Sequence, residues 1–250
     1  MFSSANLAII EIALAVIVAI ALVFVSAPYG RHFRKGWGAS LPARWGWMIM
    51  EFPAWAVMGL VVLCHPQQLT PTTALLLLLW MAHYSYRVFI YPFLLAAPRK
   101  PFPVLLVGFA ISFNVLNASA NGLGLVESAV AHPEMGIFNV RFLTGIVLFL
   151  VGFALHCGAD RHLRMLRRAS TTEYQIPQSP LFSLVSCPNY LGEIIEWCGW
   201  AIAVWSLAGL AFALFTMANL APRAWSNHQW YRSTYLAYPK NRRALIPWVW

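Results

Sequence analysis

Long apolar stretches, bounded by short polar connections, follow one another along the whole chain. Seven of them approach the roughly 20 residues that a helix needs to cross a bilayer, although the fourth and the last two are shorter. They are Leu7–Val25, Trp45–Cys64, Ala74–Ala96, Pro103–Leu116, Phe138–Cys157, Tyr190–Trp205 and Leu207–Ala221. The last two meet near Ser206, where either a tight hairpin or one long interrupted helix would fit, and we expect the hairpin.

Lysine and arginine occur in every second connection between these stretches. The connections that contain them hold Arg31, Arg34, Lys35 and Arg44, then Arg99 and Lys100, then Arg161, Arg164, Arg167 and Arg168, and finally Arg223, Arg232, Lys240, Arg242 and Arg243. The connections between them hold none. Because cytoplasmic loops are enriched in positive residues, this alternation predicts that the N-terminus lies outside and the C-terminus in the cytoplasm, and it agrees with seven crossings.

The composition supports a membrane location. Hydrophobic residues make up 60% of the chain and charged residues 10%, whereas soluble domains are about one quarter charged. A net charge of +9 would suggest nucleic acid in a soluble protein, but here the basic residues lie at the ends of apolar stretches, so we expect no nucleic-acid partner. We therefore predict an all-α fold, with residues 1–250 forming a single multi-pass membrane domain of about seven transmembrane helices.

Several ionisable residues lie inside the apolar stretches, where charge is costly. They are Glu11, Glu51, His83, Arg87, Glu193 and Glu196. Any one of them could be a polar contact between two helices. A set contributed by several helices favours a shared polar cavity, which is typical of a functional site in a membrane protein.

The stretch from Ala82 to Pro92 combines two phenols and a guanidinium. Tyr84, Arg87 and Tyr91 have helical spacing i, i+3 and i+7, which places them on one face. An interfacial aromatic belt with a snorkelling arginine would look similar, but Tyr84 lies nearer mid-span and its hydroxyl needs an internal partner. With Glu51 from the preceding span, Tyr84 could hold a carbonyl oxygen and stabilise developing enolate charge.

Polar residues also gather near the predicted cytoplasmic ends of the later spans. They are His156, Asp160, Arg164 and Arg167 on the fifth span, and Asn189, Glu193 and Glu196 on the sixth. The arginines suit phosphate binding, although a loop that only orients the protein would also be basic. The second group either caps a helix or binds an amide or sugar hydroxyls. No ligand spacing typical of a metal is present, so we expect no metal, and we expect the aromatic tail after Arg223 to pack back onto the bundle.

Several longer motifs resemble those of the steroid 5α-reductase family, the 3-oxo-5α-steroid 4-dehydrogenases. They are YGRH at Tyr29–His32, LPAR at Leu41–Arg44, EFPAW at Glu51–Trp55, HYSYRVFIYP at His83–Pro92, QIPQSPLFSLVSCPNYLGEIIEW at Gln175–Trp197 and YPKNRRALIPWVW at Tyr238–Trp250. The last two are long and specific, and the resemblance extends over nearly the whole chain. Sterol reductases and isoprenylcysteine methyltransferases resemble the C-terminal half more loosely.

The resemblance implies a seven-helix membrane reductase that passes a hydride from NADPH to C5 of a Δ4-3-oxosteroid, after which a proton is added at C4. It implies that Glu51 and Tyr84 hold the 3-oxo group. The cofactor contacts that it implies are Tyr29, Arg31, Arg87, Tyr91, His156, Asp160, Arg164, Arg167, Asn189, Glu193, Arg223 and Tyr231. The cytoplasmic loops and the C-terminal tail would then close the NADPH pocket, which agrees with a basic cytoplasmic face.

Four positions depart from the family pattern. Met50, Lys100, His156 and Asn227 stand where relatives carry glutamine, arginine, asparagine and histidine. The departures bear on individual cofactor contacts and on steroid preference, and not on the class of reaction.

Two other functions stay open on the sequence alone. One is a related membrane methyltransferase that uses S-adenosylmethionine, and the other is a carrier of lipid or steroid without enzymatic activity. The Glu51–Tyr84 pair and the many basic residues favour the reductase. We expect a lipophilic enone as substrate, contact with membrane lipid and a monomeric state. The expected location is a bacterial inner membrane, or the endoplasmic reticulum of a eukaryote, with the cofactor site facing the cytoplasm.

Overall fold

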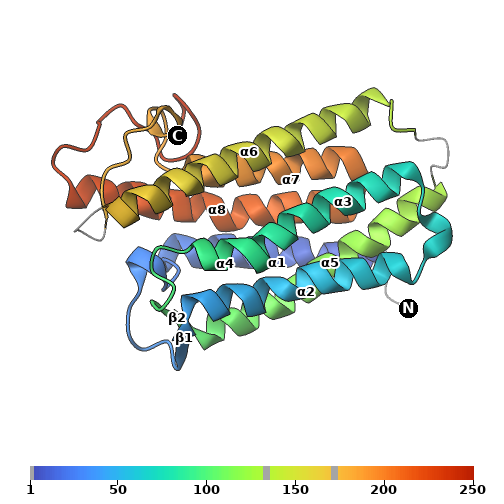
Figure 1. The fold of residues 1–250 in the computed structure, drawn as a ribbon, viewed down its shortest axis with the longest axis horizontal. Coiled ribbons are helices and arrows are strands. Elements are labelled where there is room, and N and C mark those ends of the chain that lie inside the picture. The colour runs from blue at the N-terminus through green and yellow to red at the C-terminus, as the bar shows by residue number, and fades with distance from the viewer. Residues whose placement is uncertain (1–2, 132–135, 170–173) are drawn as a thin grey trace.

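A computed structural model of the chain describes residues 3–131, 136–169 and 174–250, and it consists mainly of long helices that run along one axis (Figure 1). The helices are α1 (Ser4–Phe24), α2 (Ala43–Leu63), α3 (Pro71–Ser85), α4 (Tyr91–Leu94), α5 (Val104–Ala131), α6 (Val140–Ala169), α7 (Pro188–Val204) and α8 (Leu207–Thr234). A π-helical turn, η3 (Tyr86–Ile90), joins α3 to α4. The predicted all-α class is confirmed.

Short elements lie in the connections. They are the 3₁₀ turns η1 (Gly30–His32), η2 (Pro66–Gln68) and η4 (Pro180–Phe182) and the strands β1 (Ser40–Pro42) and β2 (Pro101–Pro103). The two strands pair antiparallel, with Leu41 opposite Phe102. This pairing ties the α1–α2 connection to the α4–α5 connection at one end of the bundle.

Within the described residues, six helical stretches are long and apolar enough to cross a membrane: α1, α2, Pro71–Leu94, α5, α6 and α8. Helix α7 has 17 residues, which at 1.5 Å per residue span about 25 Å, and it packs along α6 and α8; that it is the seventh crossing stays a prediction. The two termini lie at opposite ends of the bundle (Figure 1), as an odd number of crossings requires. Which end faces the cytoplasm stays a prediction.

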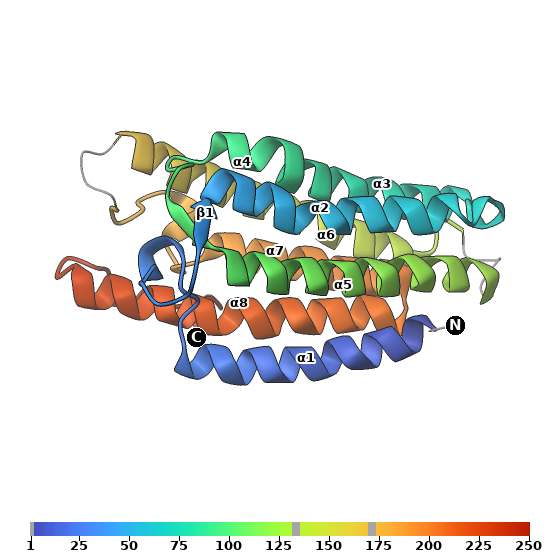
Figure 2. The same cartoon turned by 90° about the horizontal axis from the view of Figure 1, so that it is seen from below.

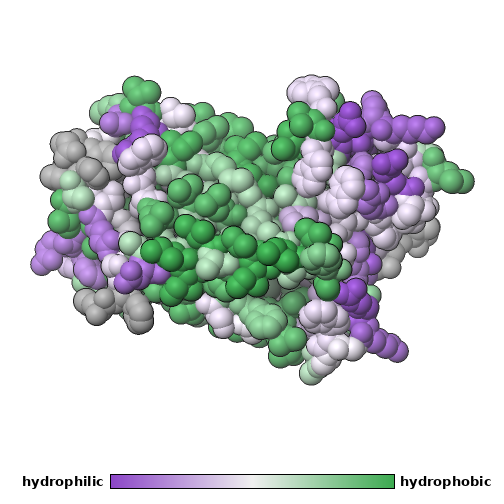
Figure 3. Space-filling view, turned by 180° about the vertical axis from the view of Figure 1, so that it is seen from behind, coloured by the Kyte–Doolittle hydropathy of each residue, from purple (hydrophilic) through white to green (hydrophobic). Residues whose placement is uncertain are grey.

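Apolar side chains cover the middle of the face shown in Figure 3, an area that we call the apolar belt, and hydrophilic side chains gather at the two ends of that face. Helix α1 contributes strongly to this belt, because Ile9, Ile17 and Val23 are largely exposed. Figure 2 shows α1 at the edge of the bundle, where it contacts α8 and α5. This surface is the one that lipid would cover.

Three helices extend well beyond their predicted ends. The fourth apolar stretch ends at Leu116 in the sequence, but α5 continues to Ala131; α6 continues to Ala169, and α8 passes Pro222 and ends at Thr234. The predictions were wrong at these ends because they stopped where polar residues begin. In α5 and α8, polar residues beyond the predicted ends, such as Asn121 and Asn227, are buried against neighbouring helices, whereas the last turns of α6 continue with exposed arginines such as Arg161 and Arg168.

Local sequence signals fix the turns between helices. Trp205 adopts a left-handed conformation after α7, and the Ser206 hydroxyl then accepts a hydrogen bond from the Gly209 amide at 3.1 Å and caps α8. The predicted hairpin between the last two spans is thereby confirmed. At the start of α3, Thr70 and Thr73 form a reciprocal capping box next to Pro71.

Helices α6 and α7 pack backbone to backbone through four glycines, which we call the glycine seam: Gly145 and Gly152 on α6, and Gly192 and Gly199 on α7. A Cβ atom on Gly152 would lie 2.3 Å from the Glu196 amide nitrogen. Corresponding Cβ atoms on the other three would lie 2.4 to 2.5 Å from a backbone nitrogen of the facing helix. Small residues at such positions let transmembrane helices approach closely, and here they bring the polar residues of α6 and α7 together.

Candidate functional site

The Glu51 carboxylate of α2 is held by an arginine from the neighbouring helix. Its Oε1 accepts hydrogen bonds from Arg87 Nη2 at 2.6 Å and from Arg87 Nε at 3.2 Å, and both side chains are buried. The guanidinium also lies over the ring of Trp47, 4.4 Å from its centre. In the described part of the chain, Glu51 is therefore paired with Arg87, and the prediction that Glu51 and Tyr84 hold a carbonyl oxygen stays a prediction.

Tyr84 lies in the aromatic core beside this pair. Its ring centre is 4.9 Å from those of Trp80 and His83 and 6.0 Å from that of Trp197. The hydroxyl is within electrostatic range of both Glu51 and Arg87. Tyr84 and the Glu51–Arg87 pair thus belong to one buried region, as the sequence predicted for Glu51 and Tyr84.

The chain between Tyr84 and Tyr91 is not the regular α-helix that the spacing argument assumed. Residues Tyr86–Ile90 form a π turn, in which the Tyr91 amide bonds to the Tyr86 carbonyl five residues earlier. This wider turn leaves Arg87 5.3 Å from the centre of the Tyr91 ring. Single π turns inside helices are frequent at functional sites.

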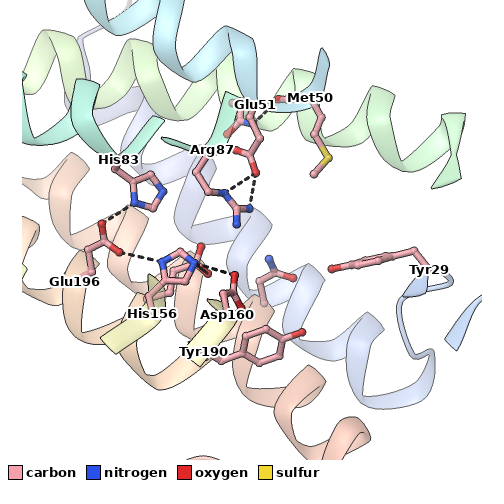
Figure 4. A network of polar contacts seen from close by, with 12 residues as sticks. Tyr29, Met50, Glu51, His83, Arg87, His156, Asp160, Tyr190 and Glu196 are labelled. Atoms are coloured by element: carbon pink, nitrogen blue, oxygen red, sulfur yellow. Dashed lines mark hydrogen bonds and ion pairs between the residues drawn. The ribbon is translucent and has the colours of Figure 1, made fainter. Parts of the chain in front are cut away.

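A line of buried polar side chains runs from His83 through Glu196 and His156 to Asp160 (Figure 4). His83 Nδ1 lies 2.6 Å from Glu196 Oε1, and the other oxygen of Glu196 lies 3.4 Å from His156 Nδ1. His156 Nε2 lies 3.6 Å from the Asp160 carboxylate, which also accepts a hydrogen bond from Asn189 Nδ2 at 3.0 Å. The glycine seam brings His156 and Asp160 of α6 against Glu196 and Asn189 of α7. His83 of α3 joins the line through its contact with Glu196.

His156, one of the positions at which the resemblance predicts a departure from the family pattern, adds an imidazole to this line. In addition to its contacts with Asp160 and Glu196, His156 has its Nε2 atom 4.0 Å from the Glu193 carboxylate. His83, His156 and Glu196 offer ligand atoms that lie within 4.8 Å of one another. Hydrogen bonds among the three account for this grouping, and the expected absence of a metal stays a prediction.

Aromatic rings surround Arg31 at the basic end of the bundle. The guanidinium lies 4.6 to 5.0 Å from the ring centres of Tyr174, Trp230 and Tyr231, and Nη2 donates to the Tyr231 hydroxyl at 3.3 Å. Burial opposes the charge, but the contacts with Tyr231 outweigh it, so the pKa of Arg31 is raised above its ordinary value. Arg31 therefore carries a permanent positive charge inside an aromatic box.

A second arginine joins α8 to the loop after α1. Arg223 donates hydrogen bonds to the hydroxyls of Tyr29 and Tyr190, the latter at 3.1 Å. Asn227, one turn further along α8, lies 3.1 Å from His32 and donates to Tyr190 at 3.4 Å. The predicted cofactor residues Tyr29, Arg31, Arg223 and Tyr231 are thus brought together.

Three further basic residues lie at the same end of the bundle, two on α6 and one in the α4–α5 connection. Arg167 and Lys100 lie 5.1 and 5.4 Å from the centre of the Tyr174 ring, and Arg164 lies 5.7 Å from that of Tyr91. One guanidinium nitrogen of Arg164 and one of Arg31 are buried without a hydrogen-bond partner among the described residues. Such buried donors are costly unless a ligand or water pairs with them.

The C-terminal tail packs against the segment before α7. The Ser186 hydroxyl contacts His228 at 2.7 Å and Tyr238 at 2.6 Å, and it donates to the Arg243 carbonyl at 3.0 Å. Arg242 donates to the Pro177 carbonyl at 3.1 Å. The two long motifs at Gln175–Trp197 and Tyr238–Trp250 therefore meet in space.

Sequence reasoning missed several residues that shape this region. Trp47 lies under Arg87, Tyr190 is bonded by Arg223, and Tyr174 contacts three cations. Aromatic residues near membrane surfaces are common, so their positions alone gave no signal. Only the structure shows that each ring faces a cation.

The structure thus defines a multi-pass helical membrane protein with a buried acid–arginine pair and a cluster of arginines and aromatic rings at one end. Residues 100–250 match the family model described as 3-oxo-5-alpha-steroid 4-dehydrogenase. The chain is 38% identical over 241 residues to the steroid 5-alpha-reductase DET2 of Arabidopsis thaliana, which covers 93% of this chain and 91% of that protein. The chain belongs to the steroid 5α-reductase family, as the resemblance implied.

Animal relatives are similar to the same degree. The chain is 36% identical over 250 residues to 3-oxo-5-alpha-steroid 4-dehydrogenase 1 of Bos taurus, covering 97% of this chain and 95% of that protein. It is 38% identical over 232 residues to 3-oxo-5-alpha-steroid 4-dehydrogenase 2 of Homo sapiens, covering 91% and 90%. The similarity therefore includes the N-terminal helices as well as the C-terminal half.

Proposed function

We propose that the protein uses NADPH to reduce the C4–C5 double bond of a Δ4-3-oxosteroid or a similar lipophilic enone within the membrane. The observation that carries the proposal is similarity over more than nine tenths of the chain to proteins named as steroid 5α-reductases. The arrangement of the site supports it, because a basic and aromatic cluster lies next to a buried acid, arginine and tyrosine.

The arginine cluster fits a cofactor that carries phosphates. The unpaired guanidinium nitrogens of Arg31 and Arg164 would be satisfied by phosphate oxygens, for which arginine is well suited. The side chains proposed to hold NADPH are Tyr29, Arg31, Arg87, Tyr91, His156, Asp160, Arg164, Arg167, Asn189, Glu193, Arg223 and Tyr231. When bound, NADPH supplies the hydride that adds to C5.

Tyr84 is the proposed donor to the 3-oxo group. An ionised carboxylate that accepts two bonds from Arg87 cannot itself donate a hydrogen bond, so the pairing favours an orienting role for Glu51. The Tyr84 hydroxyl can donate, and its bond to the oxygen strengthens as enolate charge develops there. Trp80 and Trp197 surround Tyr84 with apolar surface, which excludes water from this bond.

The test is turnover by the purified protein in mild detergent. NADPH and a Δ4-3-oxosteroid such as progesterone are added, and products are identified by mass spectrometry. Glu51→Gln and Tyr84→Phe are run alongside, with Glu127→Gln as the control, since Glu127 contacts Ser4 at the far end of the bundle. We expect a 5α-dihydro product from the native protein and the control, and at least 100-fold less from the two site variants with NADPH binding retained.

Other outcomes would redirect the proposal. NADPH binding without product would retain the cofactor and reject this class of substrate. Absence of NADPH binding would reject the reductase, and S-adenosylmethionine would be tested next.

A further inference from the structure

Glu11 is a fully buried acid whose carboxylate oxygens both lack a hydrogen-bond partner among the described residues. The other buried acids of the described bundle, Glu51, Asp160 and Glu196, are each hydrogen bonded. Leaving a buried carboxyl unpaired costs stability. Functional sites are one of the places where native proteins keep such unsatisfied groups, so Glu11 requires an explanation beyond packing.

Asn117 of α5 provides the complementary group, a buried donor. Trp200 Nε1 donates to Asn121 Oδ1 at 2.8 Å, and Asn121 Nδ2 donates to Asn117 Oδ1 at 2.8 Å. Because an indole nitrogen can only donate, this series fixes the orientation of both amides. Asn117 Nδ2 is left as a buried donor without a partner in the described structure.

Helix geometry places the two groups at the same level. Ala8 of α1 and Ala120 of α5 pack in one cluster, and Glu11 and Asn117 each lie three residues from them, on the same faces. Glu11 precedes the end of α1 at Phe24 by 24 − 11 = 13 residues, and Asn117 follows the start of α5 at Val104 by 117 − 104 = 13. Both therefore lie about 20 Å from the basic end of the bundle, at 1.5 Å per residue.

This level is deeper in the bundle than the proposed 3-oxo site. Glu51 follows the start of α2 at Ala43 by 51 − 43 = 8 residues, which is about 12 Å, so the two levels differ by about 8 Å along the axis. Helix α5, which carries Asn117, packs against both α1 and α2, so the two levels belong to the same interior of the bundle. The separation is comparable with the distance between the two ends of a four-ring steroid.

We propose that Glu11 and Asn117 form a second polar subsite, which binds a hydroxyl group at the end of the substrate opposite its enone. A hydroxyl can donate to Glu11 and accept from Asn117 at once, whereas a carbonyl can only accept. The inference rests on the proposed function, because it concerns the substrate of that reaction. It predicts that a hydroxyl at C17 is preferred over a carbonyl there, and both over a steroid without a substituent at C17.

The experiment compares reduction of three Δ4-3-oxosteroids that differ only at C17, with a 17β-hydroxyl, a 17-oxo group or hydrogen. For the native protein we expect kcat/KM for the hydroxyl steroid to exceed that for the unsubstituted steroid by about three- to tenfold, the size of one or two hydrogen bonds. The difference should lie in KM, because the contact is remote from the reacting carbons.

Three variants separate binding from folding. Glu11→Met removes both oxygens at similar volume and should abolish the preference while leaving reduction of the unsubstituted steroid unchanged. Glu11→Gln keeps an acceptor and should retain most of the preference, and Glu127→Gln is the control. Because Glu11→Met removes an unpaired buried acid, the substrate-free variant should also unfold at a higher temperature than the native protein.

The outcomes distinguish this inference from the proposed function. If the native protein reduces none of the three steroids, both fail. If it reduces all three without preference, or if Glu11→Met lowers kcat/KM equally for all of them, the subsite alone is refuted and the role of Glu11 is structural.

Discussion

The closest packing in the described bundle, at the glycine seam, gives the sharpest prediction about stability. In Gly152→Ala the new Cβ would lie 2.3 Å from the Glu196 amide nitrogen and 2.6 Å from the Gly192 carbonyl oxygen. Both are backbone atoms, so no side chain can rotate away. Helices α6 and α7 have to separate by roughly 1 Å to restore ordinary contact distances, because close-packed interiors have no slack to absorb the methyl.

The free-energy cost of Gly152→Ala comes from the packing contacts that this separation opens between α6 and α7. A gap of 0.5 to 1 Å forfeits about a quarter to a half of the dispersion energy of the contacts it opens, and overpacking of this kind costs about 1–3 kcal/mol. For a chain of this size, a loss of about 3 kcal/mol lowers Tm by roughly 10 °C. A separation of that size also takes His156 Nδ1 of α6 and Glu196 Oε2 of α7, now 3.4 Å apart, beyond hydrogen-bonding distance.

The assay is thermal unfolding in detergent, followed by tryptophan fluorescence, since Trp197 and Trp200 are buried on α7. Gly108→Ala is the matched control, because a Cβ on Gly108 of α5 meets no atom within 4 Å and alanine favours a helix over glycine by about 1 kcal/mol. We expect Tm to fall in Gly152→Ala and to stay equal or rise in Gly108→Ala. Equal Tm values for Gly152→Ala and the native protein would refute the backbone contact.

Three further outcomes are expected. Glu196→Gln should lower the free energy of unfolding by about 1–3 kcal/mol, because the charge-assisted bond to His83 is lost, and chemical denaturation that shows no loss would contradict this. Arg164→Gln should raise the Kd of NADPH about tenfold and reduce the salt dependence of NADPH binding. Titration with NADPH at two ionic strengths measures both effects, and an unchanged Kd would show that Arg164 does not bind the cofactor. Burial, together with Arg31 and Arg34, lowers the pKa of His32 below 6.5 in spite of its bond to Asn227. The unfolded chain then binds the proton more readily than the folded chain, so the contribution of His32 to the free energy of unfolding is complete above about pH 6.5 and decreases as the pH falls through the folded-state pKa. Denaturation of His32→Gln at about pH 5 and pH 7.5 should show a smaller change in the free energy of unfolding between the two pH values than the native protein shows. Identical changes in the two proteins would contradict the assignment to His32.

The sequence predicted an all-α bundle of long apolar helices because membrane spans are set by local hydrophobicity. The hairpin at Ser206 was equally local, since it depends on capping and on one turn residue. The ends of α5, α6 and α8 were not predictable in this way. A polar residue such as Asn121 predicts the end of an apolar span when only its neighbours in the sequence are considered. In the structure it is buried because it accepts a hydrogen bond from Trp200, 79 positions away.

The site shows the same division between local and tertiary information. The resemblance identified Glu51 and Tyr84, and the apolar surroundings singled out Arg87 as a buried charge. That Arg87 pairs with Glu51 depends on how α2 packs against the π turn, which no spacing along the chain determines. Glu11 was also visible as an acid inside an apolar stretch, but only the structure shows that it lacks a hydrogen-bond partner among the described residues.

The glycine seam also divides the bundle into a rigid part and a deformable part. Helices in backbone contact over their length cannot slide or tilt separately, so α6 and α7 move as one body together with the polar residues between them. Helix α1 is the least buried of the six long apolar helices described and lies at the edge of the bundle (Figure 2). A portal for a lipophilic molecule therefore costs least beside α1, and laboratory evolution toward bulkier substrates should vary the α1–α8 contacts and leave the four glycines untouched.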